Sequence, residues 1–122
     1  MVTNVTSLSR SGLWDWLIQR ITGVVLAVYV LCVCGFLLAN PDLTRADLLR
    51  FFGQGAMQVF STLALLSVGA HAWIGMWTIG TDYIGPHYVG SRATTYRFMY
   101  QTACIIVLFV YVVWGLEIFW SL

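Results

Sequence analysis

Three long stretches without any Asp, Glu, Lys or Arg alternate with short polar segments along the chain. A helix needs about 20 predominantly apolar residues to cross a bilayer. The pattern therefore predicts an all-α membrane protein with three transmembrane helices, and a single domain over residues 1–122. The approximate spans are residues 21–39, 57–79 and 98–116. Residues 13–20 mix tryptophan with charge, which suits the headgroup region, so they predict an interfacial helix leading into the first span.

The polar segments carry turn and helix-start signals. Asn40-Pro41-Asp42 ends the first apolar run, and Gly85-Pro86 ends the second. Thr44 and Asp47 have the spacing of a capping box, with Asp in the place of the usual Glu, and predict a short helix between the first two spans. Neither segment carries an obvious catalytic motif.

Composition agrees with a membrane protein and excludes several function classes. Hydrophobic residues make up 60% of the chain and charged residues 9%, whereas soluble domains have roughly 25% charged residues. All six basic residues are arginines, which argues against a polybasic nucleic-acid site. Four flank one side of the predicted membrane region and two flank the other, so the positive-inside rule predicts a cytoplasmic N-terminus and a periplasmic C-terminus. The four are Arg10, Arg20, Arg92 and Arg97.

His71 is the one histidine at membrane depth. An ionisable side chain there is costly and is a functional-site hypothesis by default. Helical spacing places it on a narrow face of small residues, namely Ala64, Ser67, Gly75 and Thr78. Two interpretations remain open. His71 could ligate the metal of a flat cofactor, or it could form a hydrogen bond to a neighbouring helix.

The histidine count limits the cofactor hypothesis. His87 follows Pro86 in a connecting segment and is expected at the surface, so a haem bound by His71 would take its second ligand from another subunit. A self-contained two-haem cytochrome is excluded, since it needs four intramembrane histidines. A cofactor-free structural or transport subunit remains an alternative. The chain has neither a Gly-rich fingerprint nor a cysteine cluster, so we predict no flavin site, no iron–sulfur cluster and no catalytic residue of its own.

Polar groups gather at the membrane edge where the second span ends. Asp82 and Tyr83 lie there, about 16 Å along the helix axis from His71, so they would serve a different ligand. The predicted topology places Arg20 at the same edge. Taken alone, Arg20 reads as a side chain that extends toward the headgroups.

These residues resemble a known family. His71-Ala-Trp-Ile-Gly-Met-Trp, followed by Thr81-Asp82-Tyr83, is similar to one of the two hydrophobic membrane anchors of bacterial succinate dehydrogenase, respiratory complex II. Arg20-Ile-Thr-Gly23 is similar to the start of the family's first span. The resemblance covers nearly the whole chain. Fumarate reductases use similar anchors and are the alternative within this group.

The resemblance implies a shared redox site in the bacterial inner membrane. The chain would pack with a second three-helix anchor around a b-type haem, and the pair would hold the iron–sulfur and flavoprotein subunits at the bilayer. His71 would be the axial ligand of the haem iron, and Arg20 would reach a haem propionate. Tyr83 and Asp82 would form part of the ubiquinone-reduction site, which passes electrons from the tricarboxylic acid cycle into respiration.

Overall fold

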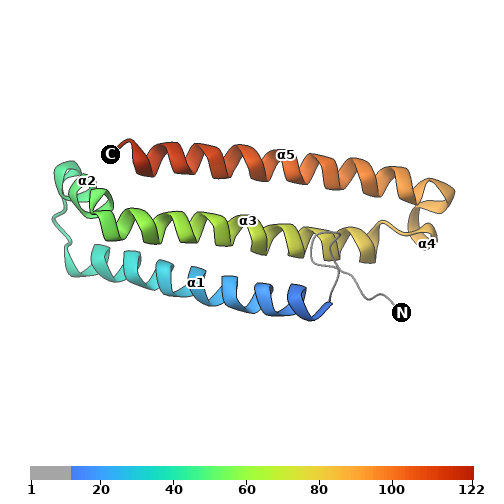
Figure 1. Cartoon of the computed structure of the whole chain (residues 1–122), viewed down its shortest axis with the longest axis horizontal. Helices are drawn as coiled ribbons and strands as arrows, with labels where there is room; N and C mark the ends of the chain where they lie inside the picture. Colours follow the sequence, from blue (N-terminus) through green and yellow to red (C-terminus); the bar gives the residue numbers. More distant parts are fainter. Residues whose placement is uncertain (1–11) are drawn as a thin grey trace.

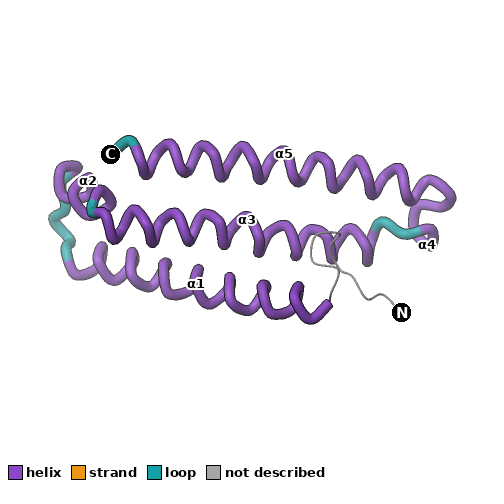
Figure 2. Tube along the Cα trace, viewed as in Figure 1, coloured by secondary structure: helices purple, strands orange, loops and turns teal. Residues whose placement is uncertain are grey.

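The computed structural model describes residues 12–122 and consists of helices joined by short connections (Figures 1 and 2). Three helices are long, and their bounds are α1 (Gly12–Ala39), α3 (Gly55–Tyr83) and α5 (Ala93–Trp120). Two short helices and a 3₁₀ turn connect them, namely α2 (Arg45–Gly53), α4 (Pro86–Val89) and η1 (Gly90–Arg92). Arg10, used in the topology argument, lies outside the described residues.

The three predicted spans fall within the three long helices. Each of these helices is long and apolar enough to cross a membrane, so the prediction of an all-α protein with three candidate spans is confirmed. The predicted interfacial segment forms the first turns of α1, without a break at Arg20. Tryptophan and charge mark the membrane edge in the sequence, but they do not interrupt a helix.

The predicted capping box is present at the start of α2. The backbone N–H of Asp47 donates to Thr44 Oγ1 at 3.2 Å, and the N–H of Thr44 donates to the Asp47 carboxylate at 3.1 Å. These hydrogen bonds, first from the Thr44 backbone and then from its hydroxyl, lower the pKa of Asp47 below its ordinary value of 3.8. Arg50 adds a weaker favourable charge, 3.7 Å from Asp47.

The long helices form a row with α3 in the middle (Figure 1). α3 packs against both α1 and α5, and no comparable interface joins α1 to α5 within the described residues. Large apolar side chains remain exposed along all three long helices. Such surfaces are suited to lipid or to helices of other subunits.

The α3–α5 interface is built on close approach at glycines. A Cβ placed on Gly69 would lie 3.4 Å from Val112, and one on Gly80 would lie 3.0 Å from the ring of Tyr100. At Gly115, a Cβ would meet the end of Leu65 at 2.6 Å. Small residues let membrane helices pack closely, and this interface uses them from both helices.

Candidate functional site

His71 lies in the interface between α1 and α3, and its ring is half-buried. Its Nδ1 atom is 3.1 Å from the hydroxyl oxygen of Thr22, which is 8% exposed on α1. The expected hydrogen bond to a neighbouring helix is therefore present. It occupies only one of the two ring nitrogens, so this contact and ligation of a metal are compatible.

The second ring nitrogen, Nε2, is free to bind. Within residues 12–122 it has no hydrogen-bond partner, and it is not among the buried unpaired side-chain atoms, so it is accessible from outside the chain. Neutral imidazole binds metals through whichever nitrogen has a free lone pair. The donor chemistry at His71 therefore fits an axial ligand of haem iron.

Glycine and other small residues hold α1 against the His71 face of α3. A Cβ on Gly23 would lie 3.6 Å from His71 Cε1, and a Cβ on Gly75 would lie 3.8 Å from the Gln19 amide nitrogen. Ser67 is 5% exposed at this interface. Because α1 covers the small-residue face itself, a flat cofactor would meet His71 at the open edge of the interface.

Arg20 lies on α1, close to one turn of helix from Gly23. Its guanidinium lies over the Trp16 ring, 5.1 Å from the ring centroid, and the side chain is exposed. It lines a cavity of about 270 Å³ at the α1–α3 edge, together with Gln19 and Thr78. Gln19 Oε1 is buried without a hydrogen-bond partner in the described chain. A guanidinium beside an unpaired amide is a reasonable environment for a carboxylate.

Asp82 and Tyr83 are the last two residues of α3, and both are exposed. The helix end that carries them is fixed by Arg97 of α5. Arg97 donates to the carbonyl oxygen of Ile84 from Nε at 3.2 Å and from Nη2 at 2.9 Å. The Ile84 N–H in turn donates to the Gly80 carbonyl. A cation at the last carbonyls is a stabilising cap for a helix C-terminus.

The four predicted site residues form two groups. His71 and Arg20 belong to the α1–α3 interface, one in its middle and one near its edge. Asp82 and Tyr83 lie apart from both, at the end of α3. The structure therefore agrees with two separate ligands, as the axial separation of about 16 Å between His71 and Asp82 predicted.

Comparison with known proteins identifies the family. Residues 2–113 match the succinate dehydrogenase/fumarate reductase transmembrane subunit family. A succinate dehydrogenase hydrophobic membrane anchor subunit of Coxiella burnetii is 34% identical over 112 residues, which are 92% of this chain and 91% of that protein. The chain belongs to the succinate dehydrogenase/fumarate reductase transmembrane subunit family. Proteins with the same description from Rickettsia conorii and Rickettsia felis are 28% and 26% identical, over 86% and 89% of this chain and 82% and 88% of their own lengths. The resemblance found in the sequence is confirmed.

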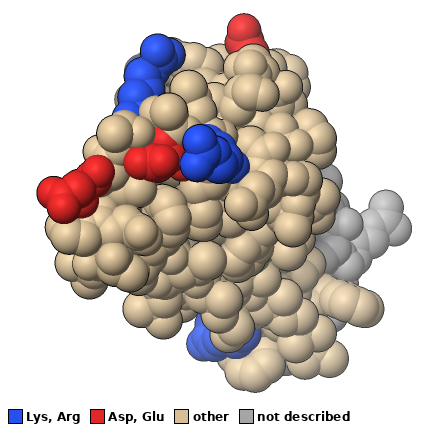
Figure 3. Space-filling view, turned by 90° about the vertical axis from the view of Figure 1, so that its left-hand side faces the viewer, with Lys and Arg blue, Asp and Glu red and all other residues tan. Residues whose placement is uncertain are grey.

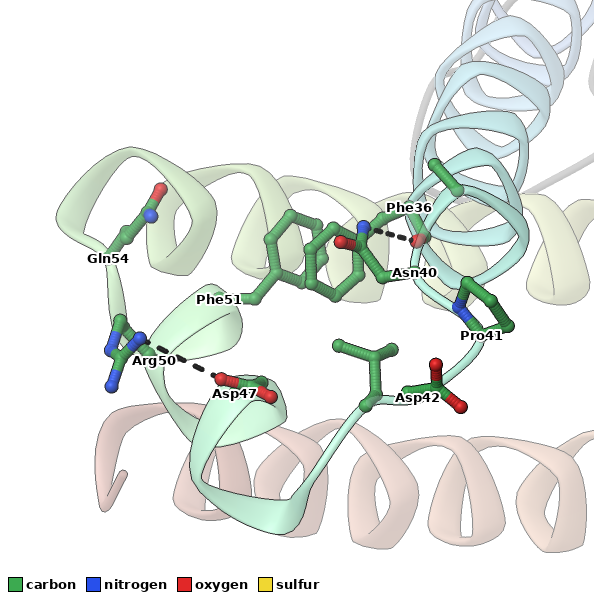
Figure 4. Close-up of a pocket in the computed structure, with 10 residues that line it drawn as sticks. Phe36, Asn40, Pro41, Asp42, Asp47, Arg50, Phe51 and Gln54 are labelled. Carbon is green, nitrogen blue, oxygen red and sulfur yellow. Dashed lines mark hydrogen bonds and ion pairs between the residues drawn. The ribbon is translucent and has the colours of Figure 1, made fainter.

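A larger cavity of this membrane anchor lies at the opposite end of the chain and is unrelated to His71. It has a volume of about 430 Å³ and opens between the end of α1 and α2 (Figure 4). Its wall includes the stacked rings of Phe36 and Phe51, 3.8 Å apart between centroids, and the Asp47–Arg50 pair. Viewed from this end, acidic and basic side chains gather on one part of a mostly uncharged face (Figure 3). Charges of both signs beside a loop are typical of a solvated membrane edge.

Sequence reasoning assigned no role to Thr22 or Gln19. Thr22 lies in the quoted segment Arg20-Ile-Thr-Gly23, beside the glycine that admits the His71 ring. A hydroxyl inside a membrane helix usually bonds to its own helix or to a neighbour, and here it does both. The signal was the small polar residue next to Gly23. His87, by contrast, is exposed on α4 against Tyr88, as predicted.

Proposed function

We propose that the chain is one of the two membrane anchors of a succinate:quinone oxidoreductase and that His71 supplies one axial ligand to a haem b shared with a second three-helix anchor. The observation that carries this proposal is the half-buried His71 ring. Its Nδ1 is bonded within the chain and its Nε2 is accessible. Family membership supplies the setting, a transmembrane subunit of succinate dehydrogenase or fumarate reductase.

Arg20 would neutralise a propionate of the same haem. Its guanidinium lines the cavity that contains the unpaired Gln19 amide, at the edge of the interface that holds His71. A charge-assisted hydrogen bond from Arg to a carboxylate is stronger than a neutral one. When bound, a b-type haem supplies reversible one-electron redox chemistry. The contribution of this chain is to hold the ligand, the charge and an apolar surround in fixed positions.

The end of α3 would contribute to a ubiquinone site. A quinone is an apolar ring with two carbonyl acceptors, so it needs an apolar pocket with a few well-placed donors. The Tyr83 phenol is a neutral donor, and Asp82 beside it can orient that donor and exchange protons with water. Quinone reduction takes up two protons, which suits an exposed helix end. The remaining walls would come from the second anchor and the iron–sulfur subunit.

The proposed topology places this site on the cytoplasmic side of the bacterial inner membrane. The arginine distribution along the sequence supports it through the positive-inside rule. The soluble flavoprotein and iron–sulfur subunits would then dock at the membrane face where α1 begins and α3 ends. Succinate oxidation would belong to the flavoprotein subunit.

Optical spectra of the purified complex test the haem ligand directly. The wild-type complex should show a b-type reduced-minus-oxidised signal of about one haem per flavin. His71→Ala should lose most of this signal, while His87→Ala, which changes the exposed histidine of α4, should keep it. Full haem occupancy with an unchanged spectrum in His71→Ala would overturn the ligand assignment.

Tyr83→Phe tests the quinone site separately. Loss of the phenol hydroxyl should lower ubiquinone reductase activity by about tenfold or more, in line with the loss of one well-placed hydrogen bond. Haem content and succinate oxidation by an artificial acceptor should remain at wild-type levels. Tyr88→Phe, at an exposed tyrosine of α4, is the matched control. Equal quinone turnover in wild type and Tyr83→Phe would exclude a role for this phenol.

A further inference from the structure

We propose that Thr22 is a positioning residue for His71. Its hydroxyl accepts the Nδ1 proton of the imidazole, fixes the ring tautomer and leaves the Nε2 lone pair directed away from α1, toward haem iron. The inference rests on the proposed role of His71 as a haem ligand and adds a residue on a different helix to that site.

Hydrogen-bond accounting at Thr22 determines the direction of the contact. A threonine hydroxyl has one hydrogen to donate and two lone pairs to accept with. Thr22 Oγ1 lies 2.7 Å from the Ile18 carbonyl oxygen and 3.3 Å from the Gln19 carbonyl oxygen. Carbonyl oxygens only accept, so the hydroxyl hydrogen is directed at the backbone of α1, best at Ile18. Oγ1 therefore faces His71 as an acceptor.

The tautomer of His71 follows from that direction. With Oγ1 as acceptor at 3.1 Å, Nδ1 must carry the ring hydrogen. In a neutral imidazole the other nitrogen then has the free lone pair. Gly23 next to Thr22 leaves room for this arrangement, because a Cβ there would already lie 3.6 Å from the ring. Thr22 and Gly23 together determine where the imidazole lies and which nitrogen can bind metal.

The same contact should influence the bound iron. An acceptor on Nδ1–H gives the imidazole partial imidazolate character and raises the basicity of the ligating nitrogen. A more basic ligand favours ferric over ferrous iron, so this hydrogen bond lowers the haem midpoint potential. Thr22 is 8% exposed, so water has little access to replace it. Removing the acceptor should therefore raise the potential and weaken haem retention.

A second threonine provides a matched control far from His71. Thr62 donates to the Gln58 carbonyl at 2.8 Å and accepts a ring N–H from Trp120 at 2.7 Å. This is the same pattern of one intrahelical donation and one accepted ring N–H, but it joins α3 to α5. Thr62→Val removes the same type of contact without touching the imidazole.

The experiment uses the complete complex carrying Thr22→Val, Thr22→Ala, Thr22→Ser or Thr62→Val. Haem per flavin and the haem midpoint potential are measured, the latter by redox titration without succinate. In Thr22→Val and Thr22→Ala we expect a higher potential and about 10–100-fold weaker haem retention, the typical cost of losing a partner of a metal ligand. Thr22→Ser keeps the hydroxyl and should restore both values. Thr62→Val should leave both unchanged.

The outcomes separate this inference from the proposed function. Haem present in wild type, lost in His71→Ala, but with wild-type retention and potential in both Thr22→Val and Thr22→Ala would overturn the role of Thr22 alone. An equal change in Thr22→Val and Thr62→Val would overturn it too, since that result reflects general helix packing. Wild-type complex without haem would overturn the proposed function and this inference together. Two hydroxyl-free variants of different size guard against misfolding of either one.

Discussion

The two interfaces of α3 differ in what they bring together. Against α1, α3 places hydroxyl and imidazole groups in pairs, Thr22 with His71 and Tyr29 with Ser61, the latter pair 2.8 Å apart. Against α5 it places glycines opposite aliphatic and aromatic side chains, as at Gly115 and Leu65. One helix therefore has a polar flank and an apolar flank.

This difference shows how a short membrane anchor can separate stability from chemistry. Lipid offers little driving force for apolar helix association, so close packing at glycines must hold α5 in place. Polar pairs specify position, because a polar group without a partner in the bilayer is costly. Ser61, with no exposed surface, fixes the register between α1 and α3. We interpret α1–α3 as the functional interface and α3–α5 as the structural one.

The largest expected effect comes from filling the space at Gly23. Gly23→Ala should be tolerated, because its Cβ would make an ordinary 3.6 Å contact with His71. Gly23→Leu should displace the imidazole and remove most of the haem from the assembled complex. The haem-to-flavin ratio measures both. Equal haem content in the Leu and Ala variants would mean that the ring position at Gly23 does not matter for ligation.

A change at the opposite interface should alter stability without altering the haem. Gly115→Ala would press on the end of Leu65, whose methyl groups can move, so we expect a cost of about 1 kcal/mol, at the low end for overpacking. Thermal unfolding in detergent should detect it. The haem spectrum and midpoint potential should match wild type, and a shifted potential would show that the two interfaces are coupled.

The Tyr29–Ser61 pair should have a smaller effect. Tyr29→Phe leaves the buried Ser61 hydroxyl without its cross-helix partner and should cost about 0.6 kcal/mol, the average for membrane hydrogen bonds. Adding Ser61→Ala should recover part of this loss, because the unpaired group is then removed. A double-mutant cycle on thermal unfolding measures the coupling. Strictly additive losses would argue that the pair contributes nothing specific.

The smallest expected effect is the pH dependence of the α2 cap. The folded-state pKa of Asp47 is lowered, so its stabilising contribution is present above the ordinary value of 3.8 and is lost as pH falls through the folded value. Hydrogen exchange of α2 should therefore increase at acidic pH in wild type and should depend less on pH in Asp47→Asn. The haem spectrum should not follow this transition, because α2 lies at the other end from Arg20.

The sequence predicted the elements better than the contacts. Charge-free runs mark three spans because only apolar helices cross a bilayer, and Thr44 with Asp47 marks α2 because the capping box is local chemistry. Arg97 and Glu117 were expected to bound the third span, but α5 continues past both. Charge limits the apolar stretch of a membrane helix and need not end the helix itself.

The site was predicted as a set of residues, without its internal bonds. His71 stands out because ionisable groups are rare in spans, and Asp82 and Tyr83 because they follow it at a helix end. Thr22 and the Arg97 contact to Ile84 could not be predicted, since both depend on which helix faces which side of α3. Hydropathy does not distinguish a lipid-facing surface from a helix-facing one.

The order of helices in the row has a consequence for biogenesis. Within the described residues, every side chain that contacts His71 or lines the Arg20 cavity lies on α1 or α3. Synthesis proceeds from the N-terminus, so both halves of this interface are made before α5. The interface can therefore form as a helical hairpin before the third span leaves the ribosome, so assembly with the cofactor need not wait for the finished polypeptide.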